Sequence, residues 1–186
     1  IDKIMLDSPK ARLGIVTTGK SYLDVEQALE YLGIDAKMAE DIGIRVYKVG
    51  MTWPLEPVGI REFAEGLEDI IVVEEKRSFI ESQMKEYMYN WPMTSESRRP
   101  SIIGKYDESG EWILPSTHEL TPARIARVIA KRLARFFQSE TIDGRLAFLT
   151  AKEKELTKQR ADYPSAAHYY SSYPHKNNNK VEEDTR

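Results

Sequence analysis

The sequence predicts an α/β protein of three layers, α/β/α, whose mainly parallel sheet has an antiparallel edge. Three short apolar runs, rich in β-branched residues, fall at 13–18, 44–49 and 69–73. A segment with apolar residues at helical spacing follows each run. Strands that alternate with helices across short connections indicate βαβ crossovers, and therefore parallel strands covered by helices.

Length and composition limit the possible functions. The 186 residues fit one domain of about 100–150 residues with a tail, or two small units. The 27 Lys and Arg against 30 Asp and Glu leave a net charge of −3, which disfavours nucleic acid as a partner. The sequence has no Cys, which excludes disulfides and Cys-ligated metal or iron–sulfur sites within it. No apolar run approaches the ~20 residues that span a bilayer, so we expect a cytoplasmic protein with no membrane partner.

The first predicted strand and helix meet at Gly19. Residues 1–11 are expected to form a linker that leads into the domain. The run at 13–18 predicts a buried strand, which Gly19 closes. Ser21 is the expected N-cap of a helix that ends at Gly33.

The second unit follows a connection at 34–43, which is polar with weak helical character. A strand is predicted at 44–49 and a helix near 58–65. The loop at 51–57 between them carries apolar side chains to the sheet edge where Gly19 lies. Such a loop forms either a ligand pocket or a surface that packs against another domain, and we favour the second.

The third predicted strand, at 69–73, runs into Glu74 and Glu75, and Ser78 is expected to cap a helix to about residue 89. Two adjacent carboxylates suggest acid–base chemistry. Consecutive strand residues point to opposite faces, so the pair cannot easily share one substrate proton. We favour a strand end that reaches solvent or a neighbouring domain.

The pattern breaks after residue 89. Pro and Gly divide residues 90–118 into short pieces, of which 102–103 and 112–114 are candidate edge strands. A hairpin across 107–110 is one arrangement of them.

Thr121 followed by Pro122 predicts the start of a further helix. This helix has cations on one face at 3–4 spacing, namely Arg124, Arg127, Lys131 and Arg135. Such a face is either solvated or binds an acidic surface, and we favour a solvated face.

The sequence turns polar toward its end. Asp143-Gly144-Arg145 is typical of a turn, residues 151–160 predict a charged helix, and the remainder resembles a linker. We therefore expect an α/β domain over 12–150, with residues 151–186 leading toward a following domain.

One segment matches the pattern of a phosphate-binding P-loop, Gly14-x-x-x-x-Gly19-Lys20-Ser21. In a P-loop a strand precedes the first Gly, and the intervening N–H groups cradle phosphate. Here the intervening residues 15–18 favour a strand themselves. We favour a strand–Gly–helix turn and keep nucleotide binding by Gly19, Lys20 and Ser21 as the alternative.

Three ordered segments, at 13–19, 48–55 and 70–75, resemble the fused 2-oxoacid:ferredoxin oxidoreductases, in particular the indolepyruvate ferredoxin oxidoreductases. In that family a strand followed by Gly-x-Ser-Tyr precedes Gly-Met-x-x-Pro-Leu and then Val-Val-Glu-Glu, as here. The resemblance covers about residues 12–160. It implies a domain similar to the carboxyl-terminal domain of transketolases.

The resemblance continues into the tail with one departure. Where family members carry Phe-Cys-Ser-Gly-Cys-Pro-His-Asn, this sequence has Tyr170 and Tyr173 at the two Cys positions and keeps Pro174 and His175. Any thiol or cluster role of the family at those positions therefore cannot operate in this chain.

The resemblance implies a parent enzyme that oxidatively decarboxylates 2-oxoacids to acyl-CoA, with thiamine diphosphate, Mg²⁺, iron–sulfur clusters and ferredoxin. The motifs that hold the cofactor lie in neighbouring domains of such enzymes, so this chain resembles a noncatalytic assembly domain. Its partners would be those domains or subunits, and a homodimer is possible. The expected domain interface is the sheet edge that carries Gly19, Gly50, Met51, Trp53, Glu74 and Glu75.

Overall fold

The computed structural model describes residues 1–90, 99–117 and 119–162, with side chains up to residue 158. Its contacts divide the chain into two units, residues 1–149 and 150–186, and the sheet belongs to the first. Residues 163–186, which include Tyr170 and Tyr173, lie outside the described residues.

Within the described part of the first unit, five strands form one sheet in the order β1-β3-β2-β4-β5. Strands β2, β3, β4 and β5 pair in parallel, and β1 pairs with β3 antiparallel. The strands are β1 (Lys3–Leu6), β2 (Leu13–Thr18), β3 (Ile44–Val49), β4 (Asp69–Val73) and β5 (Ser101–Ile103). The predicted α/β class, with its mainly parallel sheet and one antiparallel edge, is confirmed.

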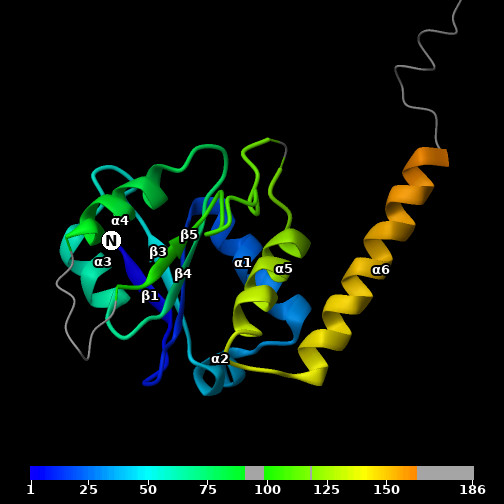
Figure 1. The fold of residues 1–186 in the computed structure, drawn as a ribbon, viewed down its shortest axis with the longest axis horizontal. Helices are drawn as coiled ribbons and strands as arrows, with labels where there is room; N and C mark the ends of the chain where they lie inside the picture. Colours follow the sequence, from blue (N-terminus) through cyan, green and yellow to red (C-terminus); the bar gives the residue numbers. More distant parts are fainter. Residues whose placement is uncertain (91–98, 118, 163–186) are drawn as a thin grey trace, which may run out of the picture. The chain divides into compact units, whose positions relative to one another are not determined.

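Helices cover both faces of the sheet, as Figure 1 shows. The helices are α1 (Gly19–Leu32), α2 (Ala36–Ile42), α3 (Pro57–Ala64), α4 (Phe79–Tyr89), α5 (Pro122–Leu133) and α6 (Glu140–Asp162). Side chains of α1, α2 and α5 share one hydrophobic cluster with one face of the sheet, and those of α3 and α4 share a second cluster with the other face. Burial of these two clusters supplies the main driving force for the fold.

The antiparallel edge lies at the opposite side of the sheet from the one the sequence indicated. Residues 1–11 were expected to be a linker, but Lys3–Leu6 form β1 beside β3. This strand is short and mostly exposed, so it carries no buried apolar run that would reveal it. Residues 112–114 form no strand, and only one bridge joins Tyr106 to Trp112.

Three further expectations were wrong in detail. Helix α1 begins at Gly19 rather than after Ser21, and Ser21 is buried in its first turn. The expected connection at 34–43 contains α2, whose N-terminus the Asp35 carboxylate caps by accepting the N–H of Met38. Asp143-Gly144-Arg145 lies within α6 and is not a turn. The predicted charged helix at 151–160 is confirmed as part of α6.

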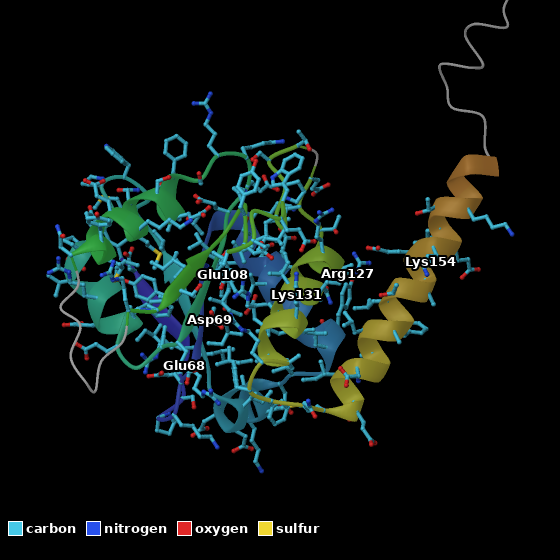
Figure 2. The ribbon with its side chains drawn as sticks, viewed as in Figure 1. Glu68, Asp69, Glu108, Arg127, Lys131 and Lys154 are labelled. Atoms are coloured by element: carbon cyan, nitrogen blue, oxygen red, sulfur yellow. The ribbon has the colours of Figure 1, made fainter. Side chains whose placement is uncertain are left out.

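The basic helix α5 begins where it was predicted, with Thr121 as its N-cap. Its cations are largely paired within the chain rather than only solvated. Arg132 is buried and forms ion pairs with Asp69 and Glu108, and Arg135 pairs with the same two acids. Figure 2 shows Asp69 and Glu108 beside α5. The network fastens the loop after β5 to α5.

The described helices include none that combines the length and the apolar character needed to cross a membrane.

Candidate domain interface

The carboxyl edge of the sheet is where the predicted residues meet. Helices α1, α3 and α4 all begin at this edge, because each follows a parallel strand. The chain leaves β2 toward β3 on one side, and β4 lies on the other side of β2. Ligands of open α/β sheets bind at such a switch point. A crevice of about 260 Å³ lies here, lined by Thr18, Gly19, Lys20, Ser21, Thr52, Glu74, Glu75, Arg77 and Phe79.

No P-loop forms at the matching segment. Residues 14–18 pair with β3 and β4 as strand β2, so their N–H groups are not free to cradle phosphate. Gly14 serves packing instead, since an added Cβ would lie 2.5 Å from Leu67 Cδ1 and 2.7 Å from Phe63 Cζ. Gly19 makes the tight turn with φ of +52°, a conformation that favours glycine. The nucleotide alternative therefore loses its structural basis.

Lys20 lies at the mouth of the crevice within a group of acids. Its Nζ is 2.9 Å from Glu119 Oε1, 3.1 Å from Asp24 Oδ2 and 3.8 Å from Glu75 Oε1. The hydrogen bond to Glu119, followed by the one to Asp24, raises the pKa of Lys20. Lys20 is therefore a paired surface cation.

Glu74, expected to reach solvent or another domain, points inward and is only 4% exposed. Its carboxylate accepts the N–H groups of Phe79 at 3.0 Å, Ile80 at 2.9 Å and Glu81 at 3.1 Å. It thus caps α4, a role expected of Ser78, whose side chain makes no cap hydrogen bond. Burial raises the pKa of Glu74, against the effect of these N–H donors.

Lys105 is a buried residue of this edge that no sequence pattern indicated. Its Nζ donates to the main-chain carbonyl of Glu74, and its N–H donates to Glu81 Oε2 at 3.0 Å. Burial lowers the pKa of Lys105, while Glu74 and Glu81 favour its charged form. The amine therefore ties the segment after β5 to the end of β4.

The loop that follows β3 is held at several points along its main chain. Asp2 Oδ1 accepts the N–H of Gly50 at 2.8 Å. Gln83, buried in α4, donates to the carbonyl of Thr52 at 2.9 Å and accepts the N–H of Leu55 at 2.7 Å. The Tyr87 hydroxyl also donates to the carbonyl of Leu55 at 3.0 Å.

Side chains of this edge nevertheless point outward. Trp53 is 70% exposed, Phe79 is 57% exposed and Met51 is 43% exposed. Gly50 and Glu75 also lie at the edge, but an added Cβ on Gly50 would lie 2.3 Å from Ile1, so this glycine serves local packing. Of the six residues expected at the interface, Glu74 alone is turned into the fold to cap a helix.

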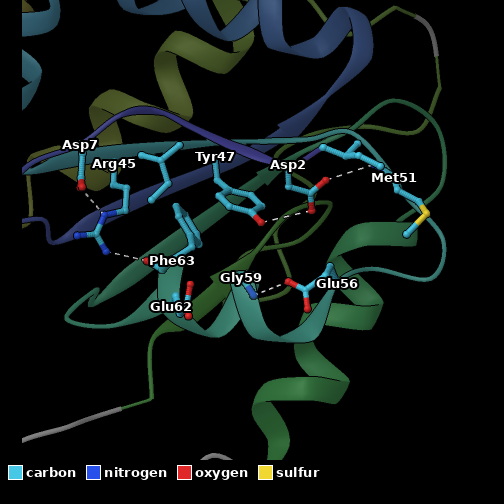
Figure 3. Close-up of a pocket in the computed structure, with 11 residues that line it drawn as sticks. Asp2, Asp7, Arg45, Tyr47, Met51, Glu56, Gly59, Glu62 and Phe63 are labelled. Carbon is cyan, nitrogen blue, oxygen red and sulfur yellow. Dashed lines mark hydrogen bonds and ion pairs between the residues drawn. The ribbon is translucent and has the colours of Figure 1, made fainter.

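A larger cavity of about 590 Å³ lies between the β1–β3 edge and α3 (Figure 3). Tyr47 and Phe63 pack against each other there, with ring centroids 5.0 Å apart. Two of its acids have structural partners. Asp7 pairs with Arg45 at 2.6 Å, and Glu56 caps α3. Burial, followed by the nearby Asp2 charge, raises the pKa of Tyr47.

Metal-binding groups are not assembled at either place. Among the side chains that the structure describes, no three or more His, Asp or Glu residues are placed to hold a metal ion.

Comparison with known proteins identifies the same family that the sequence motifs resemble. A family model described as the indolepyruvate oxidoreductase domain matches residues 3–156. The indolepyruvate oxidoreductase subunit IorA of Pyrococcus abyssi is 32% identical over 124 residues, which are 66% of this chain and 16% of that protein. IorA of Pyrococcus horikoshii is 27% identical over 168 residues, which are 90% of this chain and 22% of that protein.

A solved split-gene transketolase, described as an inactive β4 tetramer, overlaps 72% of this chain and 41% of its own, with 18% identity and a TM-score of 0.47. The chain spans only 16% and 22% of the two IorA relatives. The family model, in contrast, covers nearly the whole α/β domain and α6. On that match, the chain belongs to the indolepyruvate oxidoreductase family.

Proposed function

We propose that the chain is a noncatalytic assembly domain of a thiamine-diphosphate-dependent 2-oxoacid:ferredoxin oxidoreductase of the indolepyruvate type. The family match over residues 3–156 supports the class of enzyme. The small share of each relative that the chain spans supports a part of a larger assembly. The parent enzyme would oxidatively decarboxylate a 2-oxoacid to an acyl-CoA, with ferredoxin as electron acceptor.

One observation carries the noncatalytic role. The two most buried ionisable groups beside the crevice, Glu74 and Lys105, both serve the fold. Glu74 caps α4 with both carboxylate oxygens, and the Lys105 amine donates to the Glu74 carbonyl. A general acid or base must instead lie within hydrogen-bond reach of a substrate proton. Groups that are committed in this way are poorly suited to proton transfer.

The side chains of this chain that could bind a metal or cluster do not fit the cofactors of the parent enzyme. Mg²⁺ with a diphosphate needs one or two carboxylate ligands beside open space. The crevice offers Glu74, which is engaged by α4, and Glu75, which faces Lys20. The sequence holds no Cys for an iron–sulfur cluster. Thiamine diphosphate, Mg²⁺ and the clusters would therefore belong to other parts of the enzyme, and no step of the reaction is assigned to this chain.

An activity assay of the purified chain tests this proposal. We expect no oxidation of indolepyruvate or other 2-oxoacids when thiamine diphosphate, Mg²⁺, coenzyme A and ferredoxin are supplied. Turnover that rises with the concentration of the chain and survives repurification would contradict the proposal.

A further inference from the structure

We propose that Trp53 is the anchor of a docking face that it forms with Arg77 and Phe79. This inference rests on the proposed function and names how the domain docks. The partner is the part of the oxidoreductase that lies outside these residues. It would offer an apolar socket for the indole ring, bordered by a carboxylate for Arg77.

The first argument is the rigidity of the loop that carries Trp53. Gln83 holds the main chain on both sides of Trp53, through the Thr52 carbonyl and the Leu55 N–H. The same Gln83 Nε2 also donates to the carbonyl of Phe79 at 2.9 Å. One buried amide therefore fixes the position of Trp53 relative to Phe79. A preorganised segment loses less conformational entropy on binding.

The second argument is the exposure of Trp53 on this held loop and of Phe79 at the start of α4. Trp53 is 70% exposed and Phe79 is 57% exposed, whereas neighbouring Leu55 is fully buried in the second hydrophobic cluster. Covering an aromatic ring of this size removes about 150–250 Å² from water. Tryptophan is also among the residues that most often dominate binding energy at interfaces.

The charge of Arg77 indicates which polar group the partner would carry beside its apolar socket. Arg77 lines the crevice beside Phe79, and no hydrogen bond or ion pair engages its guanidinium among the residues described here. Lys20, by contrast, already has three acidic neighbours. A carboxylate on the partner would pair with Arg77, which favours bidentate contacts.

The length of the relatives supports the rest of the oxidoreductase as the occupant. This chain spans 16% and 22% of the two IorA proteins, so most of such a subunit lies outside the domain. The parallel strands β2, β3 and β4 end at the carboxyl edge that carries the docking face, and helices cover the two broad faces of the sheet. The carboxyl edge is therefore the end of the domain that presents apolar side chains from a fixed loop.

Hydroxyl-radical footprinting tests the proposal. The modification rates of Trp53 and Phe79 are measured in the isolated chain and in the assembled oxidoreductase purified from its source through a tag on this chain. If docking reduces the exposure of Trp53 from 70% to about 10%, its modification rate falls about sevenfold. Tyr89, which is 72% exposed at the far end of α4, is the matched control and keeps its rate.

Two outcomes would overturn the proposal. Trp53 that reacts equally fast in the isolated chain and the assembled enzyme would exclude the docking face. Protection that grows with concentration in the isolated chain would show that a second copy is the occupant.

Loss of the Phe79 protection in an assembled Gln83→Ala variant would support the positioning role of Gln83. None of these readouts depends on turnover, so the proposal can fail while the noncatalytic role stands.

Discussion

The carboxylate of Glu74 accepts the N–H of Ile80 at 2.9 Å, so the residue that follows β4 also caps the start of α4. The same carboxylate binds the N–H groups of Phe79 and Glu81. Because helix N–H groups in the first turn lack partners within the helix, this buried acid stabilises the junction between β4 and α4. Of the two adjacent acids that suggested acid–base chemistry, Glu74 therefore has a structural role and Glu75 lies at the surface.

Replacing Glu74 with Ala should destabilise the fold. The change leaves buried N–H groups of α4 without their acceptor, and we expect a loss of about 2 kcal/mol in the free energy of unfolding. Urea unfolding at neutral pH measures it. Glu75→Ala is the control, with an expected change within about 0.5 kcal/mol because its side chain is partly exposed. Equal effects of the two variants would contradict the capping role.

A methyl group on Gly14 should also destabilise the protein. The added Cβ would overlap Leu67 and Phe63, both buried in the second hydrophobic cluster. Overpacking of this kind costs about 1–3 kcal/mol, which thermal or urea unfolding would detect. Gly144→Ala is the matched control, because nothing lies near its Cβ position and it sits in a helix. A stable Gly14→Ala variant would mean that this strand tolerates a side chain.

The ion pair between Glu108 and Arg132 should make stability depend on acid. Hydrogen bonds from Arg132 hold the pKa of Glu108 well below its ordinary value of 4.5. For an acid whose pKa is lowered by folding, the stabilisation is present above 4.5 and is lost as the pH falls below it. The gap in urea midpoint between the parent chain and Glu108→Gln should therefore shrink as the pH falls from about 6 to about 3.

Burial raises the pKa of Asp69 and Glu74. Their contribution to the free energy of unfolding therefore falls as the pH rises above their ordinary pKa values, which is opposite to the effect of Glu108. Both proteins retain Asp69 and Glu74, so the comparison with Glu108→Gln reports the Glu108 contribution, including the effect of its charge on Asp69. A gap that stays constant over this pH range would contradict the assignment to Glu108.

Nucleotides should not bind at Lys20. The segment before it is a paired strand, and its ammonium is already held by Glu119 and Asp24. We expect no ATP or GTP binding below millimolar concentration in calorimetry with Mg²⁺, and no measurable shift of the urea midpoint in Lys20→Ala. Micromolar affinity that disappears in the variant would restore the P-loop interpretation.

Local sequence patterns were sufficient to predict the core of the fold. The three apolar runs became β2, β3 and β4 because buried parallel strands need continuous apolar residues. The pattern gave no sign of β1, whose residues are mostly exposed at an edge. It also misplaced the start of α1, because Gly19 could be interpreted equally as the end of a strand or the first residue of a helix.

The candidate site was less predictable, because its geometry depends on contacts between distant residues. Motif spacing predicts Trp53 and Glu75 at one edge; in the structure Glu75 lines the crevice together with Thr52, the neighbour of Trp53. Lys105 reaches Glu74 across 31 residues, and Gln83 reaches Thr52 across 31 residues. No local periodicity encodes such pairs, so the sequence did not indicate the roles of Lys105 and Gln83.

Turnover of the assembled oxidoreductase tests whether this chain supplies structure rather than chemistry. Lys20→Ala and Glu75→Gln change charged side chains that line the crevice. We predict that kcat and KM, measured per assembled enzyme, stay within about twofold of the parent enzyme. A fall in kcat of about a hundredfold or more in either variant, with assembly and folding unchanged, would show that the crevice takes part in catalysis and would contradict the noncatalytic role.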